Sequence, residues 1–487
     1  MKIEITRRNF LGASASMATA ASLRNGEGLG AAAAQPPNVV FVFADQWRAQ
    51  DAGYAGNPQV RTPNLDRMAE RSAVFANAVS GCPVCSPYRA SLLTGQYWHR
   101  HGIFYNDKPL AGEARSMGKL FAEAGYDTAY IGKWHLNGHP PGIDYQESRN
   151  APVPRERRQG FQYWKARECT HEYNQSYYFD EQDRRCQWEG YDSIAQTRMA
   201  VEYLKSRRKA EGRPFLMVLS WGPPHDPYHT APEEFRSLYP DPAKIALRPN
   251  VPAASESAAQ KVLAGYYAHI AALDRCLGEL QQALQETGLE ENTVFVFTSD
   301  HGDMLYSQGQ TMKQKPWDES IRVPFLLRFP ARLGNRSRNV QAPINTPDIL
   351  PTLLGLCRLP IPAAVDGRDY TPLLAGGRET GEEAALLACL VPFHQWNYRN
   401  GGREYRGLRT ARYTYVRDLR GPWLFYDNRQ DPFQLTNLCG RKEFVSLQKE
   451  MEKQLAQQLR RAGDRFLPGP EYMRQWGYTW DGQDRPS

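Results

Sequence analysis

The sequence predicts an α/β fold in which a large mixed, mostly parallel sheet is sandwiched by helices, with a smaller α+β subdomain at the C-terminus. Apolar runs of strand character alternate with amphipathic stretches of helical character through most of the chain. The runs are apolar along their whole length, as is typical of parallel strands buried on both faces. From about residue 385 this alternation gives way to short strands and polar turns.

The first predicted element beyond the N-terminal segment is a strand at 38–45 that ends in an acidic residue. A helix is expected at 62–72, because Thr62-Pro63 joins an N-cap residue to a proline at the first helical position. The other strands are predicted at 127–134, 214–221, 293–300 and 323–330, and the other helices at 194–212, where Gly212 would end the helix, and at 258–288.

Two segments interrupt the alternation. Residues 136–192 are rich in proline, aromatic and charged residues, which indicates a long insertion over the ends of the strands, within a main domain of residues 35–384. Residues 385–487 are expected to form the C-terminal subdomain, with a small antiparallel sheet and an amphipathic helix at 443–463. The end, 464–487, has no regular pattern.

The N-terminus has the pattern of an export signal. Arg7-Arg8 is followed by Asn9-Phe10-Leu11, an alanine-rich stretch and small residues suited to cleavage. We interpret residues 1–34 as a twin-arginine signal peptide rather than a disordered alanine-rich tail. No later stretch is long and apolar enough to span a membrane, so the mature protein is expected to be periplasmic or secreted.

Charge and cysteine content narrow the class of protein. The formal net charge is +7 without a long basic run, which argues against nucleic acid and is compatible with a small anionic substrate. Eight cysteines in 487 residues are too few for a disulfide scaffold. Cys169 and Cys186 flank a polar, aromatic-rich stretch and are the one candidate pair.

Polar side chains stand where the predicted strands end, at Asp45, Lys133, Trp221 and Asp300. Because the carboxyl ends of parallel strands meet at one edge of a sheet, these residues are expected to share a site. Two carboxylates and an amide oxygen, from Asp45-Gln46 and Asp300-His301, suit Ca²⁺ or Mg²⁺, and the imidazole of His301 keeps Mn²⁺ and Zn²⁺ open. Each pair taken alone is more often a helix cap.

The stretch "SGCPVCSPYRASLLTG" contains Cys82 and Cys85 in a CxxC arrangement. A redox pair would need a thioredoxin-like setting, and half of a zinc site would need a second Cys/His pair at a suitable spacing. The sequence offers neither.

Instead, "CSPYRASLLTG" resembles the signature of type I sulfatases, Cys-x-Pro-x-Arg followed by Thr-Gly. The resemblance extends over nearly the whole mature chain and implies the fold of the alkaline-phosphatase superfamily. Its other segments, in family order, are "FADQW", "TPNLDRMAE", "IGKWHL", "GPPHDPY", "FTSDHGDM", "KQKPWDESIRVPF" and "INTPDILPTLLGL".

The resemblance implies that a formylglycine-generating enzyme, reading Pro87 and Arg89, oxidises Cys85 to formylglycine. Hydration of the aldehyde would give a geminal diol. One hydroxyl, made more acidic by a bound cation, would attack sulfur and displace the alcohol, leaving a covalent sulfated intermediate. The second hydroxyl would then re-form the aldehyde and expel sulfate. Neither serine nor a thiol has that second hydroxyl, which is the chemical reason for the modification.

Four further residues match the family's positions for binding the transferred group. By analogy Lys133 and Lys313 would hold sulfate oxygens, His135 would bind the diol, and His225 would protonate the leaving group. Arg89 would steady the diol from below. Lys315 competes with Lys313, which is preferred because it stands four residues before Trp317, and the nearby His101 is interpreted as structural.

Departures from the family pattern keep other functions open. Many relatives have two acids where this chain has Asp45-Gln46, so cation binding should be weaker. Gln308 stands where relatives commonly have a histidine. Phosphonate monoester and phosphodiester hydrolases share the "DQW" form and are the first alternative, and a non-catalytic binder of sulfated glycans is the second.

The leaving group is predicted to be a carbohydrate, or possibly an aryl group. The residues expected to grip a sugar are Asn106, His394, Trp396, Arg399 and Arg403, because aromatic stacking and arginine contacts suit a sulfated glycan.

Overall fold

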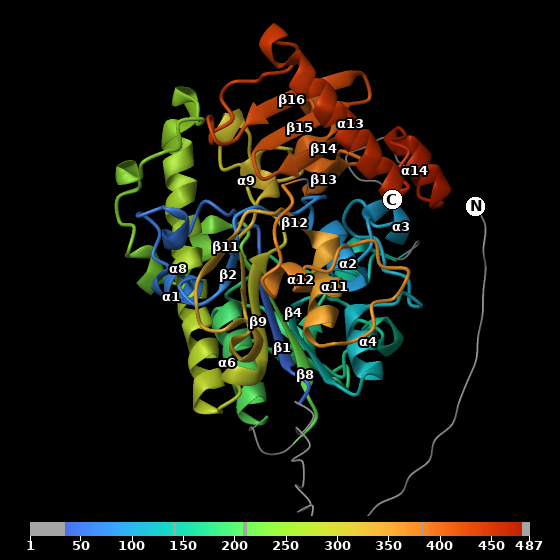
Figure 1. Cartoon of the computed structure of the whole chain (residues 1–487). Coiled ribbons are helices and arrows are strands. Elements are labelled where there is room, and N and C mark those ends of the chain that lie inside the picture. The colour runs from blue at the N-terminus through green and yellow to red at the C-terminus, as the bar shows by residue number, and fades with distance from the viewer. Residues whose placement is uncertain (1–34, 140–142, 208–211, 382, 480–487) are drawn as a thin grey trace, which may run out of the picture. The chain divides into compact units, whose positions relative to one another are not determined.

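A ten-stranded sheet is the centre of the computed structural model, which describes residues 35–139, 143–207, 212–381 and 383–479. In spatial order its strands are β11 (Arg338–Val340), β2 (Ala73–Phe75), β10 (Phe325–Arg328), β9 (Thr293–Ser299), β1 (Asn38–Asp45), β8 (Phe215–Pro224), β4 (Asp127–Lys133), β5 (Tyr163–Arg167), β6 (Tyr177–Phe179) and β7 (Arg185–Gln187) (Figure 1). The central strands β9, β1, β8, β4 and β5 run parallel to one another. The mixed, mostly parallel sheet confirms the predicted fold class.

Helices lie on both sides of this sheet (Figure 1). One apolar cluster contains Val40 and Val42 of β1 together with residues of α1, α6 and α8, and a second contains Val39, Phe41 and Phe43 with residues of α2, α4 and α11. Successive side chains of β1 thus enter opposite layers, as a strand buried on both faces requires. These helices are α1 (Pro63–Ala69), α6 (Asp192–Lys205), α8 (Glu256–Glu286), α2 (Cys85–Thr94), α4 (Met117–Glu123) and α11 (Thr346–Leu356).

The shorter elements connect the layers. Strands β3 (Ala78–Val79) and β12 (Ile344–Asn345) form a separate two-stranded parallel sheet. The short helices of the same region are α3 (Trp98–His101), α5 (Tyr145–Asn150), α7 (Glu233–Arg236), α9 (Asp318–Ile321), α10 (Pro330–Leu333) and α12 (Thr371–Leu374).

Three predicted elements differ from the structure. The helix expected at 194–212 ends at Lys205, and residues 208–211 lie outside the described residues. The strand expected at 323–330 is the shorter β10, which pairs antiparallel with both β9 and β2. Residues 136–192 do not only cover the site, because β5, β6 and β7 lie within them and lengthen the main sheet beyond β4.

The C-terminal part contains the expected small antiparallel sheet, formed by β13 (Ala384–Cys389), β14 (Tyr405–Thr410), β15 (Tyr413–Asp418) and β16 (Gly421–Asp427). Helix α13 (Val445–Ala462) packs on it. The segment predicted to be irregular contains a further helix, α14 (Gly469–Gln475). Arg406 of β14 secures this end of the chain, since it is buried and donates to Asp464 and to Tyr472 Oη. From Pro36 onward the chain packs as one unit, and the predicted boundary at residue 384 stays a prediction.

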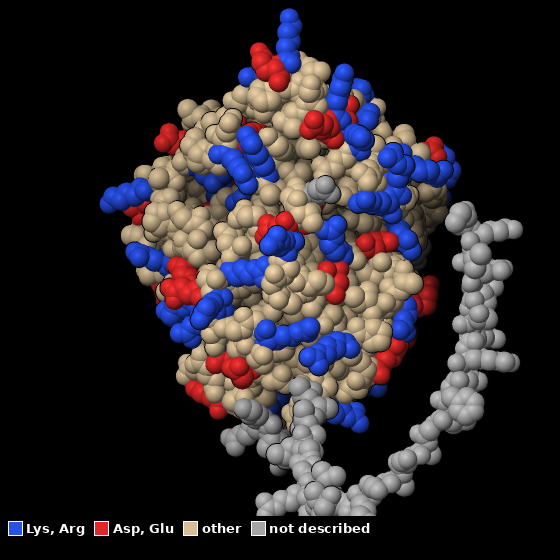
Figure 2. Space-filling view, in the orientation of Figure 1, with Lys and Arg blue, Asp and Glu red and all other residues tan. Residues whose placement is uncertain are grey.

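The eight cysteines are free thiols, so the pair suggested for Cys169 and Cys186 is not formed. The predicted signal peptide, residues 1–34, lies outside the described residues. Among the helices that the structure describes, none has the length and apolar character needed to cross a membrane. On the face shown in Figure 2, basic and acidic side chains are interspersed.

Candidate active site

The predicted strand-end residues meet at one edge of the sheet. Asp45 ends β1, Asp300 follows β9, and Lys133 ends β4. Helix α2 begins at Cys85 and places its thiol among them, 3.7 Å from Asp45 Oδ1. Trp221 is also buried, but its indole donates to Thr197 Oγ1, which gives it a role in packing.

Four buried side chains form a group suited to a cation. Ligand atoms of Asp45, Cys85, Asp300 and His301 all lie within 4.8 Å of one another. His301 Nδ1 contacts the carbonyl oxygen of Gly302 at 2.9 Å, so Nε2 is left to face Cys85 Sγ at 3.3 Å, the orientation that a metal ligand needs. Burial and the negative charge of Asp45 raise the pKa of Asp300 to about 6. A bound cation would remove that repulsion, so the residues fit a divalent metal ion.

Gln46 adds an amide oxygen beside this group. Lys313 Nζ lies 3.1 Å from Gln46 Oε1 and 3.2 Å from Cys85 Sγ, so the oxygen and the thiol share one neighbour. The amide nitrogen of Gln46 donates to Asp303 Oδ2 at 2.7 Å, which fixes which end of the amide faces the site. Its backbone is in the left-handed region, with φ of 73°. A non-glycine residue keeps this backbone conformation only when its surroundings stabilise it. For Gln46, the hydroxyl of Tyr266 does so by donating to the Gln46 carbonyl at 2.6 Å.

Arg89 lies among the carboxylates rather than in the open part of the site. Its guanidinium donates to Asp45 at 3.0 Å and to Asp300 at 3.3 Å, and also to the Lys133 carbonyl and Ser220 Oγ, each at 2.7 Å. It therefore sets the orientation of both acids. The predicted contact of Arg89 with the diol stays a prediction.

Two lysines and a histidine surround the thiol. Lys133 Nζ is 2.6 Å from Asp45 Oδ2, and although burial opposes its charge, Asp45 raises the pKa of Lys133 above its usual value. Lys313 Nζ is 2.7 Å from His225 Nε2. His225 Nδ1 is held 3.0 Å from a carboxylate oxygen of Asp226, so Nε2 is the nitrogen that faces the site.

His135 approaches from the other side. Its Nε2 lies 3.2 Å from Asp107 Oδ1, whereas its buried Nδ1 has no hydrogen-bond partner among the described residues. Burial disfavours the charged ring, but Cys169 and Asp107 outweigh it and raise the pKa of His135 to about 9. Like Gln46 it has a positive φ, of 58°, and Ser86 Oγ fixes its carbonyl at 2.8 Å.

Other candidates have structural contacts. Asn106 accepts from the Ser86 backbone N–H at 3.0 Å and so holds the start of α2. Lys315 points away from Cys85, because its Nζ donates to the Thr311 carbonyl at 2.6 Å. His101 contacts Ser91 Oγ and accepts from the Ile103 backbone, as its structural interpretation expects.

The predicted sugar-gripping residues of the C-terminal part have mixed positions. Trp396 is buried with Lys315 over its ring, and Arg403 forms an ion pair with Asp418. Burial removes Trp396 from contact with a sugar, and the role of Arg403, which is partly exposed, stays a prediction. His394 is half-buried on a short turn, Arg399 is exposed, and their roles stay predictions. Gln308 donates to the carbonyls of Phe433 and Gln434, so it joins two loops.

The sequence did not point to Asp107, Asp226, Asp303 or Tyr266. Asp303 follows His301 in the same turn, and its spacing is the only sequence signal that could have identified it. Asp226 directly follows His225, so its position was a similar signal. Asp107 and Tyr266 contact their partners across 28 and 220 positions of chain, and nothing in the local pattern marks them.

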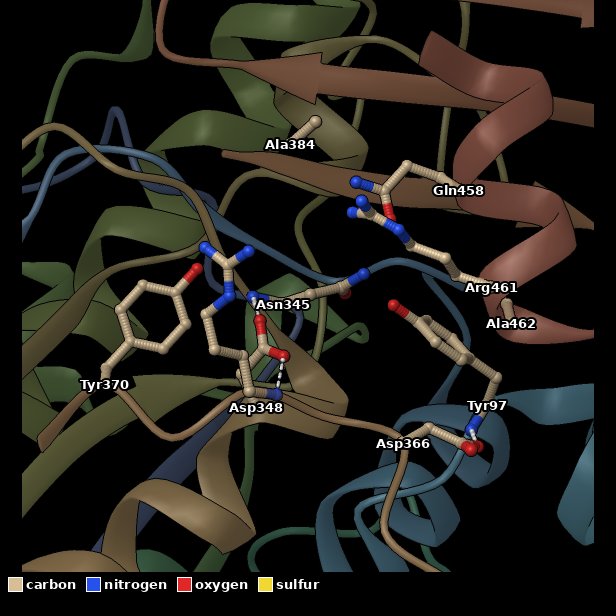
Figure 3. A pocket seen from close by; sticks show the side chains of 10 residues that line it. Tyr97, Asn345, Asp348, Asp366, Tyr370, Ala384, Gln458, Arg461 and Ala462 are labelled. Atoms are coloured by element: carbon tan, nitrogen blue, oxygen red, sulfur yellow. Dashed lines mark hydrogen bonds between the residues drawn. The ribbon is translucent and has the colours of Figure 1, made fainter. Parts of the chain in front are cut away.

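Away from Cys85, a cavity of about 170 Å³ lies between α13 and the start of α11 (Figure 3). Gln458 and Arg461 extend toward it from α13, opposite Tyr97 (Figure 3). Its acids, Asp348 and Asp366, accept hydrogen bonds from backbone N–H groups and so serve the local structure. No residue around Cys85 lines it.

Buried acids at the end of a parallel sheet, a thiol at a helix start and converging lysines suit the hydrolysis of anionic esters. Residues 37–359 match the family described as Sulfatase, and residues 309–461 match the family described as N-sulphoglucosamine sulphohydrolase, C-terminal. The chain therefore belongs to the sulfatase family and is a sulfuric ester hydrolase, which confirms the resemblance seen in the sequence.

Named relatives agree with this membership. The chain is 42% identical over 454 residues to an ulvan-active sulfatase of Formosa agariphila, covering 93% of this chain and 86% of the relative. It is 33% identical to an endo-4-O-sulfatase of Bacteroides thetaiotaomicron, covering 83% and 88%. A solved 4S-sulfatase structure, from work on glycosaminoglycan metabolism by the same bacterium, has a TM-score of 0.79 at 31% identity and covers 91% and 99%.

The contact between Gln46 and Asp303 gives a test of this geometry. Gln46→Glu would place a carboxylate oxygen against Asp303 Oδ2, where the amide now donates at 2.7 Å. We expect the single variant to lose about 2–4 kcal/mol of unfolding free energy, measured by chemical denaturation in cation-free buffer.

The matched control is the double variant Gln46→Glu/Asp303→Asn, in which a donor again faces an acceptor. It should recover most of the loss. A single variant as stable as the parent protein would show that the two side chains are not in contact.

Proposed function

We propose that this protein is an exported sulfatase that removes sulfate from a sulfated carbohydrate, with Ca²⁺ and a formylglycine formed from Cys85. The observation that carries the proposal is the position of Cys85, buried at the start of α2 between the acids Asp45 and Asp300 and the base Lys313. The names of the relatives favour a carbohydrate, since they are described as acting on ulvan and as an endo-4-O-sulfatase.

Cations supplied by the chain match the charge of a sulfate ester. In the proposed reaction Lys133 and Lys313 bind sulfate oxygens and stabilise the charge that develops on them. Lys313 Nζ lies 3.2 Å from Cys85 Sγ, and Lys133 Nζ lies 2.6 Å from Asp45, which is next to Cys85. Sulfate bound between the two lysines would therefore lie against the nucleophile. Asp45, Gln46, Asp300 and His301 would hold the cation, which when bound supplies a Lewis acid next to residue 85.

Two histidines face the reacting groups. His225 has its Nδ1 fixed by Asp226, so its Nε2 can donate a proton to the departing alcohol. His135 has its Nε2 on Asp107 and a free buried Nδ1, and because its raised pKa keeps the ring charged, Nδ1 can donate a hydrogen bond to the diol of residue 85. The Cys85 sulfur stands in for a formylglycine oxygen, and the modified residue would supply two hydroxyls on one carbon, one to attack sulfur and one to expel sulfate.

Export and maturation complete the proposal. The Arg7-Arg8 pattern supports passage through the twin-arginine system to the periplasm or the medium. Pro87 and Arg89 follow Cys85 at the spacing that a formylglycine-generating enzyme is expected to read.

Sulfate release from a substrate panel tests the carbohydrate assignment. We expect kcat/KM for a sulfated oligosaccharide to exceed that for an aryl sulfate by at least about 100-fold, because contacts to the sugar contribute binding energy to the transition state. A matched aryl phosphodiester should be the poorest substrate. Faster turnover of the phosphodiester would instead support the phosphodiesterase alternative.

Mass spectrometry of the peptide containing Cys85 tests the modification. Protein matured in its own host should carry the aldehyde in place of the thiol, and Cys85→Ala should fold normally yet release no sulfate. Cys82→Ala is the matched control, because Cys82 packs in the apolar cluster under the small sheet, and it should keep both the aldehyde and the activity. An active enzyme with an unmodified Cys85 thiol would rule out this mechanism.

Removal of the cation tests the metal assignment. Dialysis against a chelator should abolish sulfate release and lower Tm, and added Ca²⁺ should restore both. At a Ca²⁺ concentration 100 times Kd the expected stabilisation is about 2.7 kcal/mol. Recovery with Zn²⁺ but not with Ca²⁺ would assign the site to zinc and refute the calcium proposal.

A further inference from the structure

Next to the active site lies a cavity of about 480 Å³ whose lining is strongly basic. We call it the arginine pocket, after Arg149, Arg167 and Arg185. Cys169, His171 and Tyr177 also line it. Its acidic lining residue is Glu172, which is exposed.

The pairing of β4 with β5 places the arginine pocket beside the active site. Arg167 pairs in register with Lys133 across β5 and β4. Just beyond this pair, the backbone N–H of His135 donates to the carbonyl of Glu168 at 2.8 Å. From the other side, the His171 ring stacks on His225 with centroids 4.5 Å apart and planes 13° apart. The pocket therefore adjoins both histidines of the proposed reaction, His135 and His225.

The guanidinium groups of the pocket are held in place by aromatic rings and an amide, without a carboxylate partner. Arg167 and Arg185 sandwich the Tyr177 ring, with guanidinium carbons 3.9 and 3.7 Å from its centroid. Asn150 Oδ1 accepts from both Arg167 and Tyr177, at 3.0 and 2.6 Å. Arg149 lies over the Tyr145 ring at 5.1 Å.

In the described part of the chain, no ion pair joins a carboxylate to Arg149, Arg167 or Arg185. The Nε atoms of Arg149 and Arg167 are buried without a hydrogen-bond partner, and Arg167 is only 8% exposed. Buried charge without a carboxylate partner is costly, and an anionic group whose two oxygens accept hydrogen bonds from a guanidinium would offset that cost.

The pKa of the Cys169 thiol is a second sign of positive potential in the pocket. Burial alone would raise the pKa of its thiol, but Lys133, His135 and Arg149 outweigh burial and hold the pKa well below its usual value. The pocket thus favours negative charge at a position that the scissile sulfate, held by Lys133 and Lys313, does not occupy.

We propose that the arginine pocket binds a second anionic group of the substrate, carried by the sugar next to the one that bears the scissile sulfate. The group is a carboxylate or a further sulfate ester, which present the same chemistry to arginine. The inference rests on the proposed carbohydrate function and narrows it to polyanionic glycans.

The experiment compares four substrates by kcat/KM for sulfate release. They are a sulfated disaccharide with an adjacent uronate, the same compound with its carboxyl reduced to the alcohol, a disaccharide with a second sulfate in place of the uronate, and an aryl sulfate. The parent enzyme should prefer an anionic disaccharide over the carboxyl-reduced one by about 10- to 100-fold, the range expected for hydrogen bonds to a charged group.

Arg185→Met is the main variant, because Arg185 is exposed on β7 and its loss should leave the fold intact. It should remove most of the preference for the anionic disaccharide, and Arg149→Met should act in the same direction. The matched control is Arg155→Met. Arg155 belongs to the same insertion, residues 136–192, and its described contact is one hydrogen bond to the Glu181 carbonyl. It should retain the parent preference, and the Tm values of the variants check folding.

The outcomes separate the two proposals. Loss of preference for the uronate compound assigns the pocket to a carboxylate, and loss for the disulfated compound assigns it to a second sulfate. Equal turnover of anionic and reduced disaccharides by the parent, or an unchanged preference in Arg185→Met and Arg149→Met, overturns the arginine pocket alone. Turnover of the aryl sulfate without release from any disaccharide overturns the carbohydrate function and this inference with it.

Discussion

The placement of two buried carboxylates side by side constrains the rest of this site. Asp45 and Asp300 end or follow neighbouring parallel strands, so the sheet brings them together whatever else surrounds them. Like charges in a buried position must be compensated. Arg89, within α2, contacts both acids, and Lys133, the last residue of β4, contacts Asp45. Compensation of the acids thus also determines where α2, and with it Cys85, can begin.

This dependence explains what could be predicted from the sequence. Strands β1, β8 and β9 are continuous apolar runs, so local pattern identified them, and the topology of parallel strands brought Asp45 and Asp300 to one edge. The antiparallel direction of β10 and the addition of β5–β7 to the sheet follow from long-range pairing, which no local pattern encodes. The helix α14 was missed because a short segment rich in glycine and proline resembles a loop.

The candidate site shows the same division. The residues that the family signature marks, Cys85, Lys313 and His225, lie together. The polar and aromatic residues of the C-terminal part were chosen by type alone, and Trp396 and Arg403 proved to be engaged in internal contacts. The three arginines of the arginine pocket are spread over 37 positions of sequence from Arg149 to Arg185. The pairing of β5, β6 and β7 brings Arg167 and Arg185 to one cavity, and α5 adds Arg149.

The location of β5, β6 and β7 has an evolutionary consequence. They form the outer margin of the sheet, beyond β4, and the central register of β9, β1 and β8 does not depend on them. Substitutions in this margin can therefore alter the proposed second anion site while the residues around Cys85 are inherited unchanged. An ancestor with one chemistry could in this way give rise to a series of enzymes that divide the sulfated polysaccharides of an environment among them.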